Sequence, residues 1–168
     1  PLDEATTFGP IASRKQFDRI NNYLALGKEE GADLHKLTMS GELPTSGFYR
    51  PPVLFDNTNN SMRIVQEEIF GPILSVISFK TDEEAIRLSN AVSYGLAATA
   101  WTKDLSRARR LARDLDAGDI SICSTTTPAA PTAALSMEPF GQSGHGVLGG
   151  RRGLEPYQRT KAVQIITD

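Results

Sequence analysis

The sequence has few of the residues that build the simplest catalytic and metal sites. One cysteine, Cys123, among 168 residues cannot form an internal disulfide, and the two histidines, His35 and His145, lie too far apart for a spaced set of metal ligands. With 18 Lys and Arg against 20 Asp and Glu, the net charge of −2 offers no attraction for nucleic acid or an anionic membrane. No apolar run reaches the length of a membrane span, and the first residues lack the pattern of a signal peptide. We therefore expect a cytoplasmic protein with no metal, no nucleic-acid partner and no membrane association.

Capping patterns and apolar spacing predict three helices. Ser13-x-x-Gln16 opens a capping box for a helix over residues 13–31, and Thr81 with Glu84 opens another for residues 81–92. A third helix is predicted over residues 104–117, with Gly118 beyond its end and an inward face made by Leu105, Ala108, Leu111, Ala112 and Leu115.

Runs of β-branched and apolar residues predict strands between these helices. The runs cover residues 73–79, 97–101 and 119–123, which gives the order β-α-β-α-β. Crossovers of this kind require parallel neighbours, so the predicted fold is a three-layer α/β/α arrangement with a mostly parallel sheet. Sites in such sheets lie beyond the carboxyl ends of the strands, and the last strand runs into a Thr-, Pro- and Ala-rich loop that is a candidate pocket wall.

Three groups with possible chemistry have plainer interpretations. Cys123 has no cation or helix start beside it in sequence, so we interpret it as a small buried hydrophobic residue. His145 stands between glycines with no acidic residue to orient it. The G-x-G-x-x-G spacing over residues 144–149 follows no strand, so it is interpreted as accidental. A small thiol enzyme that uses Cys123 and His145 stays an alternative.

A more specific pattern is "VQEEIFGPILSV", which places Glu67 and Glu68 just before Phe70 and a buried strand. Adjacent residues of an extended segment point in opposite directions, so only Glu68 is expected to share a face with Phe70. A carboxylate can accept hydrogen bonds from ribose hydroxyls while an aromatic ring packs on a base, so this pair suits a nucleoside. The alternative is a solvated acid beside a core Phe.

Several ordered motifs together resemble one family. "EEIFGPILSVISF", "SNAVSYGLAATAWTKDLSRARRLARDLDAGDISI" and "PFGQSGHG…GGRRGLEPYQRTKAV" look like the C-terminal portion of the aldehyde dehydrogenase superfamily, and "PLDEATTFGPIASRKQFDRI" resembles the segment before it. The resemblance implies NAD(P)-dependent oxidation of an aldehyde to a carboxylic acid through a cysteine thiolate, hydride transfer and thioester hydrolysis.

The resemblance also implies roles for residues of this chain. Glu68 matches the acid that holds the nicotinamide ribose, and Phe70 matches the aromatic residue at the nicotinamide end. The loop that begins with Ser124, Thr125 and Thr126, with Phe140 at its end, matches the lining of the aldehyde tunnel.

The same resemblance divides the chain and implies self-association. Residues 1–153 correspond to part of a catalytic domain, and residues 154–168 to a C-terminal oligomerisation segment. The β-prone run over residues 160–167 has no later element to cover its edge, so we expect it to pair with another subunit.

The chain departs from the family pattern in three ways. The family's cofactor domain, its general-base glutamate and its nucleophilic cysteine all precede the point that corresponds to Pro1, so no catalytic residue is assigned and the chain alone is expected to be inactive. Cys123 stands where the family strand commonly carries asparagine, and the "PFGQSGHG" loop is about three residues shorter than usual. A non-catalytic assembly module that retains the fold is the alternative function.

Overall fold

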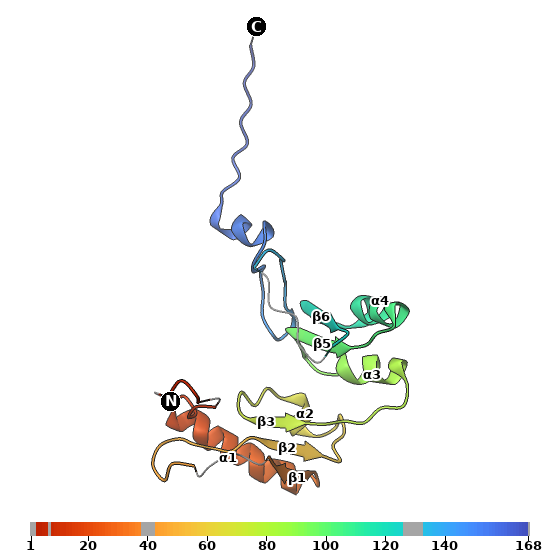
Figure 1. Ribbon diagram of the computed structural model, residues 1–168. Coiled ribbons are helices and arrows are strands. Elements are labelled where there is room, and N and C mark those ends of the chain that lie inside the picture. Colours follow the sequence, from red (N-terminus) through yellow and green to blue (C-terminus); the bar gives the residue numbers. More distant parts are fainter. Residues whose placement is uncertain (1–2, 7, 38–42, 126–132, 168) are drawn as a thin grey trace. The chain divides into compact units, whose positions relative to one another are not determined.

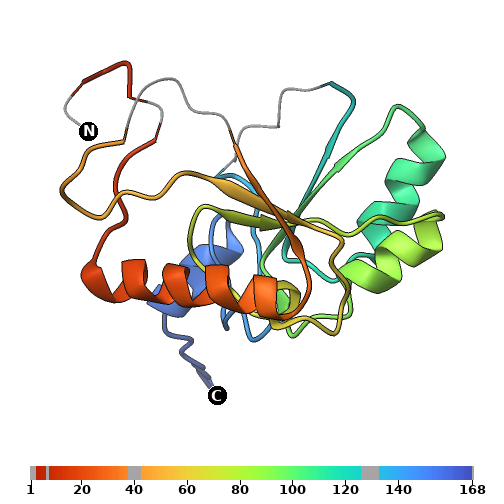
Figure 2. The same cartoon turned by 90° about the horizontal axis from the view of Figure 1, so that it is seen from below.

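Two units of secondary structure follow one another along the chain, Pro1–Glu84 and Ala85–Asp168. The structure is a computed structural model, and it describes residues 3–6, 8–37, 43–125 and 133–167 (Figures 1 and 2). Each unit is described by itself below.

The first unit contains one long helix beside a mixed three-stranded sheet (Figures 1 and 2). Strand β1 is antiparallel to β2, and β2 is parallel to β3. The elements in chain order are α1 (Arg14–Glu29), β1 (Asp33–Lys36), β2 (Val53–Asp56), α2 (Arg63–Gln66) and β3 (Ile73–Ser75).

The core of the first unit forms between α1 and this sheet. Ile20 on α1 and Phe55 on β2 are both fully buried, and Tyr23 and Ile64 are nearly so. Gly27 lets α1 approach the sheet, because a Cβ atom there would lie 2.5 Å from the Phe55 ring. Of the described residues classed as buried and hydrophobic, all but Cys123 belong to this unit.

The second unit contains two short two-stranded sheets. Strands β5 and β6 are parallel and pair from Ala97 opposite Asp119 to Trp101 opposite Cys123, whereas β4 and β7 are antiparallel. Helix α3 begins in the first unit and ends in the second. The elements are α3 (Asp82–Ser89), β4 (Tyr94–Gly95), β5 (Ala97–Trp101), α4 (Leu105–Asp114), β6 (Asp119–Cys123), β7 (Phe140–Gly141) and the 3₁₀ helix η1 (Arg152–Tyr157).

The predicted α/β fold class is confirmed, and so are the predicted helix starts. Ser13 Oγ accepts from the Gln16 N–H at 3.2 Å, and Thr81 Oγ1 accepts from the Glu84 N–H at 3.2 Å. The predicted parallel crossover from residues 97–101 to residues 119–123 is present as β5–α4–β6. Strands β1, β4 and β7 were not predicted, because two to four residues are too few for a periodic pattern.

The strand predicted over residues 73–79 is shorter in the structure and ends at Ser75. Its last ladder bond is donated by the Val76 N–H to the Phe55 carbonyl at 2.9 Å. Strand β2 ends at Asp56, and the chain turns at Asn57, whose φ is +55°. Beyond Ser75, β3 therefore has no β2 residue to pair with.

The prediction for α4 was wrong at its end and on part of its face. The helix ends at Asp114 because Leu115 is extended, with ψ of 130°. Leu105 is 65% exposed and Ala112 is also exposed, whereas Ala108, Leu111 and Leu115 are half-buried. The β5–β6 sheet has only two strands, so within this unit it covers one narrow stripe of the helix.

Residues 158–167 contain neither helix nor strand and are exposed to solvent (Figure 1). Three large apolar side chains in this segment, Val163, Ile165 and Ile166, are 70%, 83% and 83% exposed. Pairing of the segment with another subunit stays a prediction. Among the described residues, no helix is both long and apolar enough to cross a membrane.

Candidate functional site

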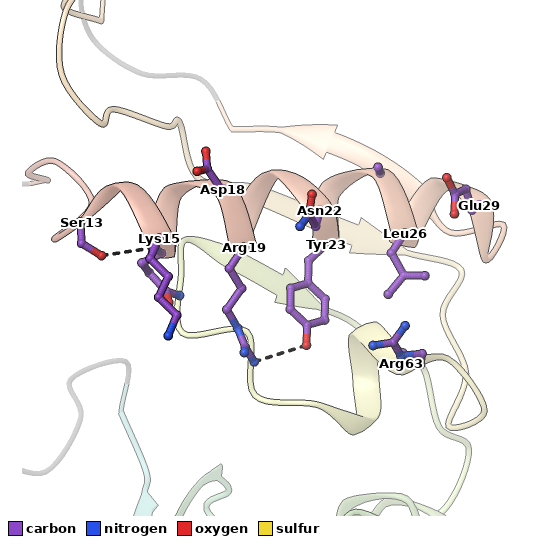
Figure 3. A pocket seen from close by; sticks show the side chains of 11 residues that line it. Ser13, Lys15, Asp18, Arg19, Asn22, Tyr23, Leu26, Glu29 and Arg63 are labelled. Carbon is purple, nitrogen blue, oxygen red and sulfur yellow. Dashed lines mark hydrogen bonds between the residues drawn. The ribbon is translucent and has the colours of Figure 1, made fainter.

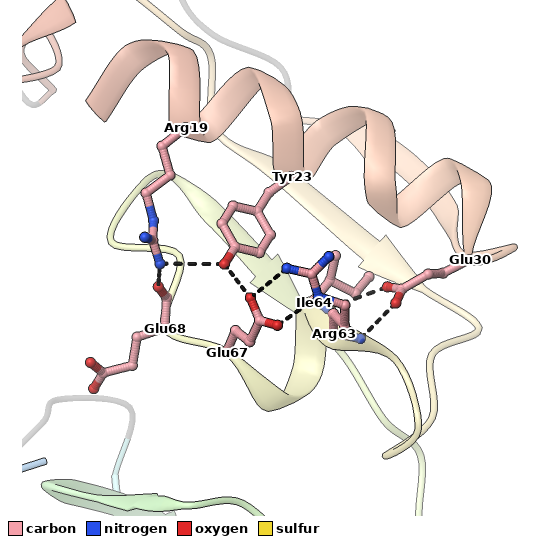
Figure 4. Close-up of polar contacts among 7 residues, drawn as sticks. All are labelled: Arg19, Tyr23, Glu30, Arg63, Ile64, Glu67 and Glu68. Carbon is pink, nitrogen blue, oxygen red and sulfur yellow. Dashed lines mark hydrogen bonds and ion pairs between the residues drawn. The ribbon is translucent and has the colours of Figure 1, made fainter. Parts of the chain in front are cut away.

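The candidate site is built around the loop of Glu67–Phe70, which joins α2 to β3 (Figure 4). Three side chains from α1 bind this loop, and we name them the α1 clamp: Gln16, Arg19 and Tyr23. Spacings of three and four residues place them along one face of the helix. The clamp therefore ties four consecutive loop residues to a single helix.

The clamp bonds run in order along the loop. Tyr23 Oη donates to the Glu67 carboxylate at 2.5 Å, and Arg19 Nη2 donates to the Glu68 carbonyl at 2.6 Å. Gln16 Nε2 donates to the carbonyl of Ile69 at 2.8 Å and to that of Phe70 at 2.6 Å. Backbone carbonyls accept most of these bonds, so the loop's path is fixed while its side chains stay available.

Glu67 has a structural role within this arrangement. Arg63 on α2 donates to both of its oxygens, from Nε at 2.6 Å and from Nη2 at 3.1 Å (Figure 4). These hydrogen bonds, followed by the one from Tyr23, hold the pKa of Glu67 below its ordinary value. Burial, followed by the hydrogen bond to Glu67, raises the pKa of Tyr23. The network favours a charged Glu67 and a neutral Tyr23.

A further contact joins the end of α1 to α2. The Glu30 carboxylate, directly after α1, accepts from the backbone N–H groups of Arg63 at 2.7 Å and Ile64 at 3.3 Å (Figure 4). This carboxylate satisfies two N–H groups that a helix start leaves without an intrahelical partner. Helix α2, which supplies Arg63 to Glu67, is thus itself held by the α1 end.

The side chains of Glu67 and Glu68 point in different directions, as the sequence predicts. Figure 4 shows the Glu67 carboxylate within the network and the Glu68 carboxylate pointing away from it. Among the described residues, no side-chain bond to the Glu68 carboxylate is found. Glu68 is therefore the one of the two acids that is available to a ligand.

Phe70 adopts an unusual backbone conformation, so the expectation of a fully extended segment was wrong at this residue. Its φ is +54° and its side chain is 75% exposed. A bulky residue rarely adopts the left-handed region, and such strain costs on the order of 1–3 kcal/mol. The alternative of a core Phe is excluded by the exposure, and the strain is balanced locally by the two bonds from Gln16.

Sequence reasoning missed the role of Gln16. The capping box predicts that its side chain turns back to the helix start, whereas the structure places its amide on the loop at residues 69 and 70. The signal that could have found this is position, because Gln16 precedes the fully buried Ile20 by one helical turn.

A groove along α1 includes the clamp (Figure 3). Its lining carries charges of both signs, including Lys15, Arg19 and Arg63 and the acids Asp18 and Glu29. Figure 3 shows the Arg19 and Tyr23 side chains extending from the helix to the same side as Arg63. Of the clamp residues, Arg19 is thus exposed along the groove, whereas Tyr23 is nearly buried.

The predicted tunnel residues lie in the second unit. Ser124 and Thr125 follow the carboxyl end of β6 and are exposed, and Phe140 in β7 is 46% exposed. Thr126 lies outside the described residues.

The remaining candidates, Cys123, His145 and the glycine spacing, lie in the second unit. Cys123 is a free thiol that is 6% exposed at the end of β6. His145 is exposed in a loop between Gly144 and Gly146, both with positive φ. The glycine spacing follows the exposed two-residue strand β7 and precedes only the 3₁₀ helix η1, so it lacks the buried strand and the α-helix of a dinucleotide site. The described part of the chain holds no group of three metal-ligating side chains.

The Glu67 network predicts a pH-dependent contribution to stability. Because the folded-state pKa of Glu67 is lowered, its stabilising effect is present above the unfolded pKa and is lost as the pH falls through the folded pKa. We expect Glu67→Gln to lower the free energy of unfolding at pH 7, with the difference from wild type shrinking toward pH 3. Urea unfolding at several pH values measures this. A difference that stays constant across the range contradicts the assignment.

Comparison with known proteins identifies one family. The chain matches the aldehyde dehydrogenase family over residues 1–163. It is 42% identical to an aldehyde dehydrogenase-like protein of Schizosaccharomyces pombe, over 98% of the chain and 32% of that protein.

Solved structures of aldehyde dehydrogenases have a similar fold. An NAD-dependent aldehyde dehydrogenase from Sinorhizobium meliloti superposes with a TM-score of 0.87 at 33% identity, over 98% of the chain and 32% of that structure. The NAD⁺ complex of an aldehyde dehydrogenase from Bacillus cereus gives 0.85 at 35% identity, over 96% and 32%. The chain thus spans about a third of the length of these relatives.

Proposed function

The chain belongs to the aldehyde dehydrogenase family, and we propose on that basis that it is part of an NAD(P)-dependent enzyme that oxidises an aldehyde to a carboxylic acid. The observation that carries the proposal is the clamped loop, which directs the Glu68 carboxylate outward and leaves Phe70 75% exposed. Relatives of known structure are described as NAD-dependent or as NAD⁺ complexes, which supports the choice of cofactor class.

The loop residues fit the nicotinamide end of such a cofactor. We propose that the Glu68 carboxylate accepts hydrogen bonds from the ribose hydroxyls, since no other described group uses it. Phe70 offers an exposed aromatic face for the nicotinamide ring. When bound, the cofactor's nicotinamide ring would accept the hydride. The part played by this chain is to hold the ribose and the ring in place.

We propose that residues of the second unit line the path of the aldehyde. Ser124 and Thr125 are exposed just past the carboxyl end of β6, the edge of a parallel sheet at which ligands commonly bind. Phe140 adds an apolar, partly exposed surface. Thr126 is included on the resemblance alone.

The division into a partial catalytic domain, residues 1–153, and an oligomerisation segment, residues 154–168, is also proposed. The exposed apolar side chains after residue 158 support it, because such side chains are normally covered by another surface. The single cysteine, which cannot form an internal disulfide, is the reason for proposing a cytoplasmic location.

The test is an assay of the complete protein that contains this segment. We expect NADH or NADPH and the carboxylic acid to appear in equal amounts when it is given NAD⁺ or NADP⁺ and a panel of aldehydes. We expect no turnover from the 168-residue chain alone, because its sole thiol, Cys123, is buried and therefore poorly placed to attack a substrate. A complete protein that reduces neither cofactor with any aldehyde would favour the assembly module instead.

A further inference from the structure

We propose that Gln16 is a positioning residue that sets the direction of Phe70 and, through it, the hold on the nicotinamide. Only the second part of this inference, the effect on the nicotinamide, rests on the proposed function. Its first half, that Gln16 fixes the backbone at Phe70, concerns this chain by itself.

The geometry of Gln16 matches this role. Its amide nitrogen carries two N–H groups, and it donates to two successive carbonyls, at 2.8 Å to Ile69 and 2.6 Å to Phe70. These two bonds lie on either side of the Phe70 N–Cα bond, whose rotation gives the unusual φ of +54°. Releasing them frees that rotation, and the exposed ring has little packing to keep its direction.

The next residue confirms that the loop is held closely against α1 at this point. A Cβ atom on Gly71 would lie 2.6 Å from two carbon atoms of the fully buried Ile20 side chain. Ile20 is one helical turn beyond Gln16, so the chain is held by hydrogen bonds at Phe70 and by packing at Gly71. The packing of Gly71 against Ile20 fixes the position of the backbone but not the rotation about the Phe70 N–Cα bond. The two bonds from Gln16 fix that rotation.

The first experiment uses the 168-residue chain and needs no cofactor. A residue with positive φ gives a strong NMR cross-relaxation peak between its own amide and Hα protons, because the two lie unusually close. We expect this peak for Phe70 in the wild type, and a weakening of at least twofold in Gln16→Ala and in Gln16→Glu, which keeps the length but lacks the N–H donors. Lys15→Ala, an exposed neighbour on α1, serves as the matched control and should leave the peak unchanged.

The second experiment uses the complete protein and single-turnover hydride transfer. We expect Gln16→Ala to slow hydride transfer about fivefold to tenfold, and to cause no further loss when Phe70→Leu is already present. That coupling separates a role through Phe70 from a general loss of stability, which would be additive.

The outcomes are distinguishable. An unchanged Phe70 peak in both Gln16 variants, or additive losses in the double variant, overturns the inference. A wild-type complete protein without hydride transfer overturns the proposed function, and with it the nicotinamide half of the inference, while the NMR result still decides whether Gln16 fixes Phe70.

Discussion

Replacing Glu68 by Gln should slow hydride transfer in the complete protein at least tenfold while leaving its stability nearly unchanged. The Glu68 carboxylate points away from the network of Glu67, so its charge is not needed to hold the loop. Losing a charge-assisted pair of hydrogen bonds to a ribose costs about 1.5–3 kcal/mol, and about 1.4 kcal/mol corresponds to a factor of ten. The expected loss is therefore in the positioning of the nicotinamide.

Single-turnover absorbance of NADH or NADPH measures this change, and thermal unfolding of the same samples monitors the fold. Glu29→Gln provides a matched control, since Glu29 is another exposed acid in the first unit and no role in the loop is assigned to it. Hydride transfer at the wild-type rate in Glu68→Gln would remove the ribose assignment. A parallel fall in the unfolding temperature would show instead that the charge supports the fold.

The parts of this site that the sequence predicts are those set by local geometry. Adjacent carboxylates in a nearly extended segment must diverge, so Glu68 could be separated from Glu67 without any structure. Helix starts were predicted for the same reason, because Ser13 and Thr81 need only the next three residues to form their caps.

The parts that the sequence does not predict depend on contacts between distant segments. The bonds from Gln16 reach 53 and 54 residues along the chain, and the bond from Arg19 to the Glu68 carbonyl reaches 49. No local pattern encodes that register. The positive φ of Phe70 has the same origin, because a bulky residue takes that conformation only where distant groups hold it.

The exposed face of α4 shows a different limit. The apolar pattern correctly marks an amphipathic helix, but it does not say which surface covers each position. Leu105 and Ala112 are exposed although both belong to the predicted inward face. A pattern of apolar residues indicates which side of a helix is apolar. It does not show that the two-stranded β5–β6 sheet is too narrow to cover Leu105 and Ala112.

Removing every residue after Gln158 should shift the sedimentation mass of the chain toward that of a monomer. The segment of residues 160–167 carries Val163, Ile165 and Ile166, which are 70–83% exposed in the single chain, and β-branched residues of this kind favour an extended strand. Its backbone N–H and C=O groups are available to pair with a sheet edge of a second copy. We therefore expect the intact chain to be at least dimeric at micromolar concentration.

The fold should survive this truncation, because the segment contributes none of the buried core. Among the residues that the structure describes, the fully buried side chains, Ile20 and Phe55, lie in the first unit. The segment contains no helix or strand whose loss would change the circular dichroism. Analytical ultracentrifugation of both chains gives the masses, and Val163→Thr with Ile165→Thr provides a variant of full length that keeps β propensity while removing apolar contact. An unchanged oligomeric mass after truncation would show that another surface holds the subunits together. A monomeric intact chain would show instead that assembly needs a surface outside these 168 residues, because the exposed segment would then have no partner within them.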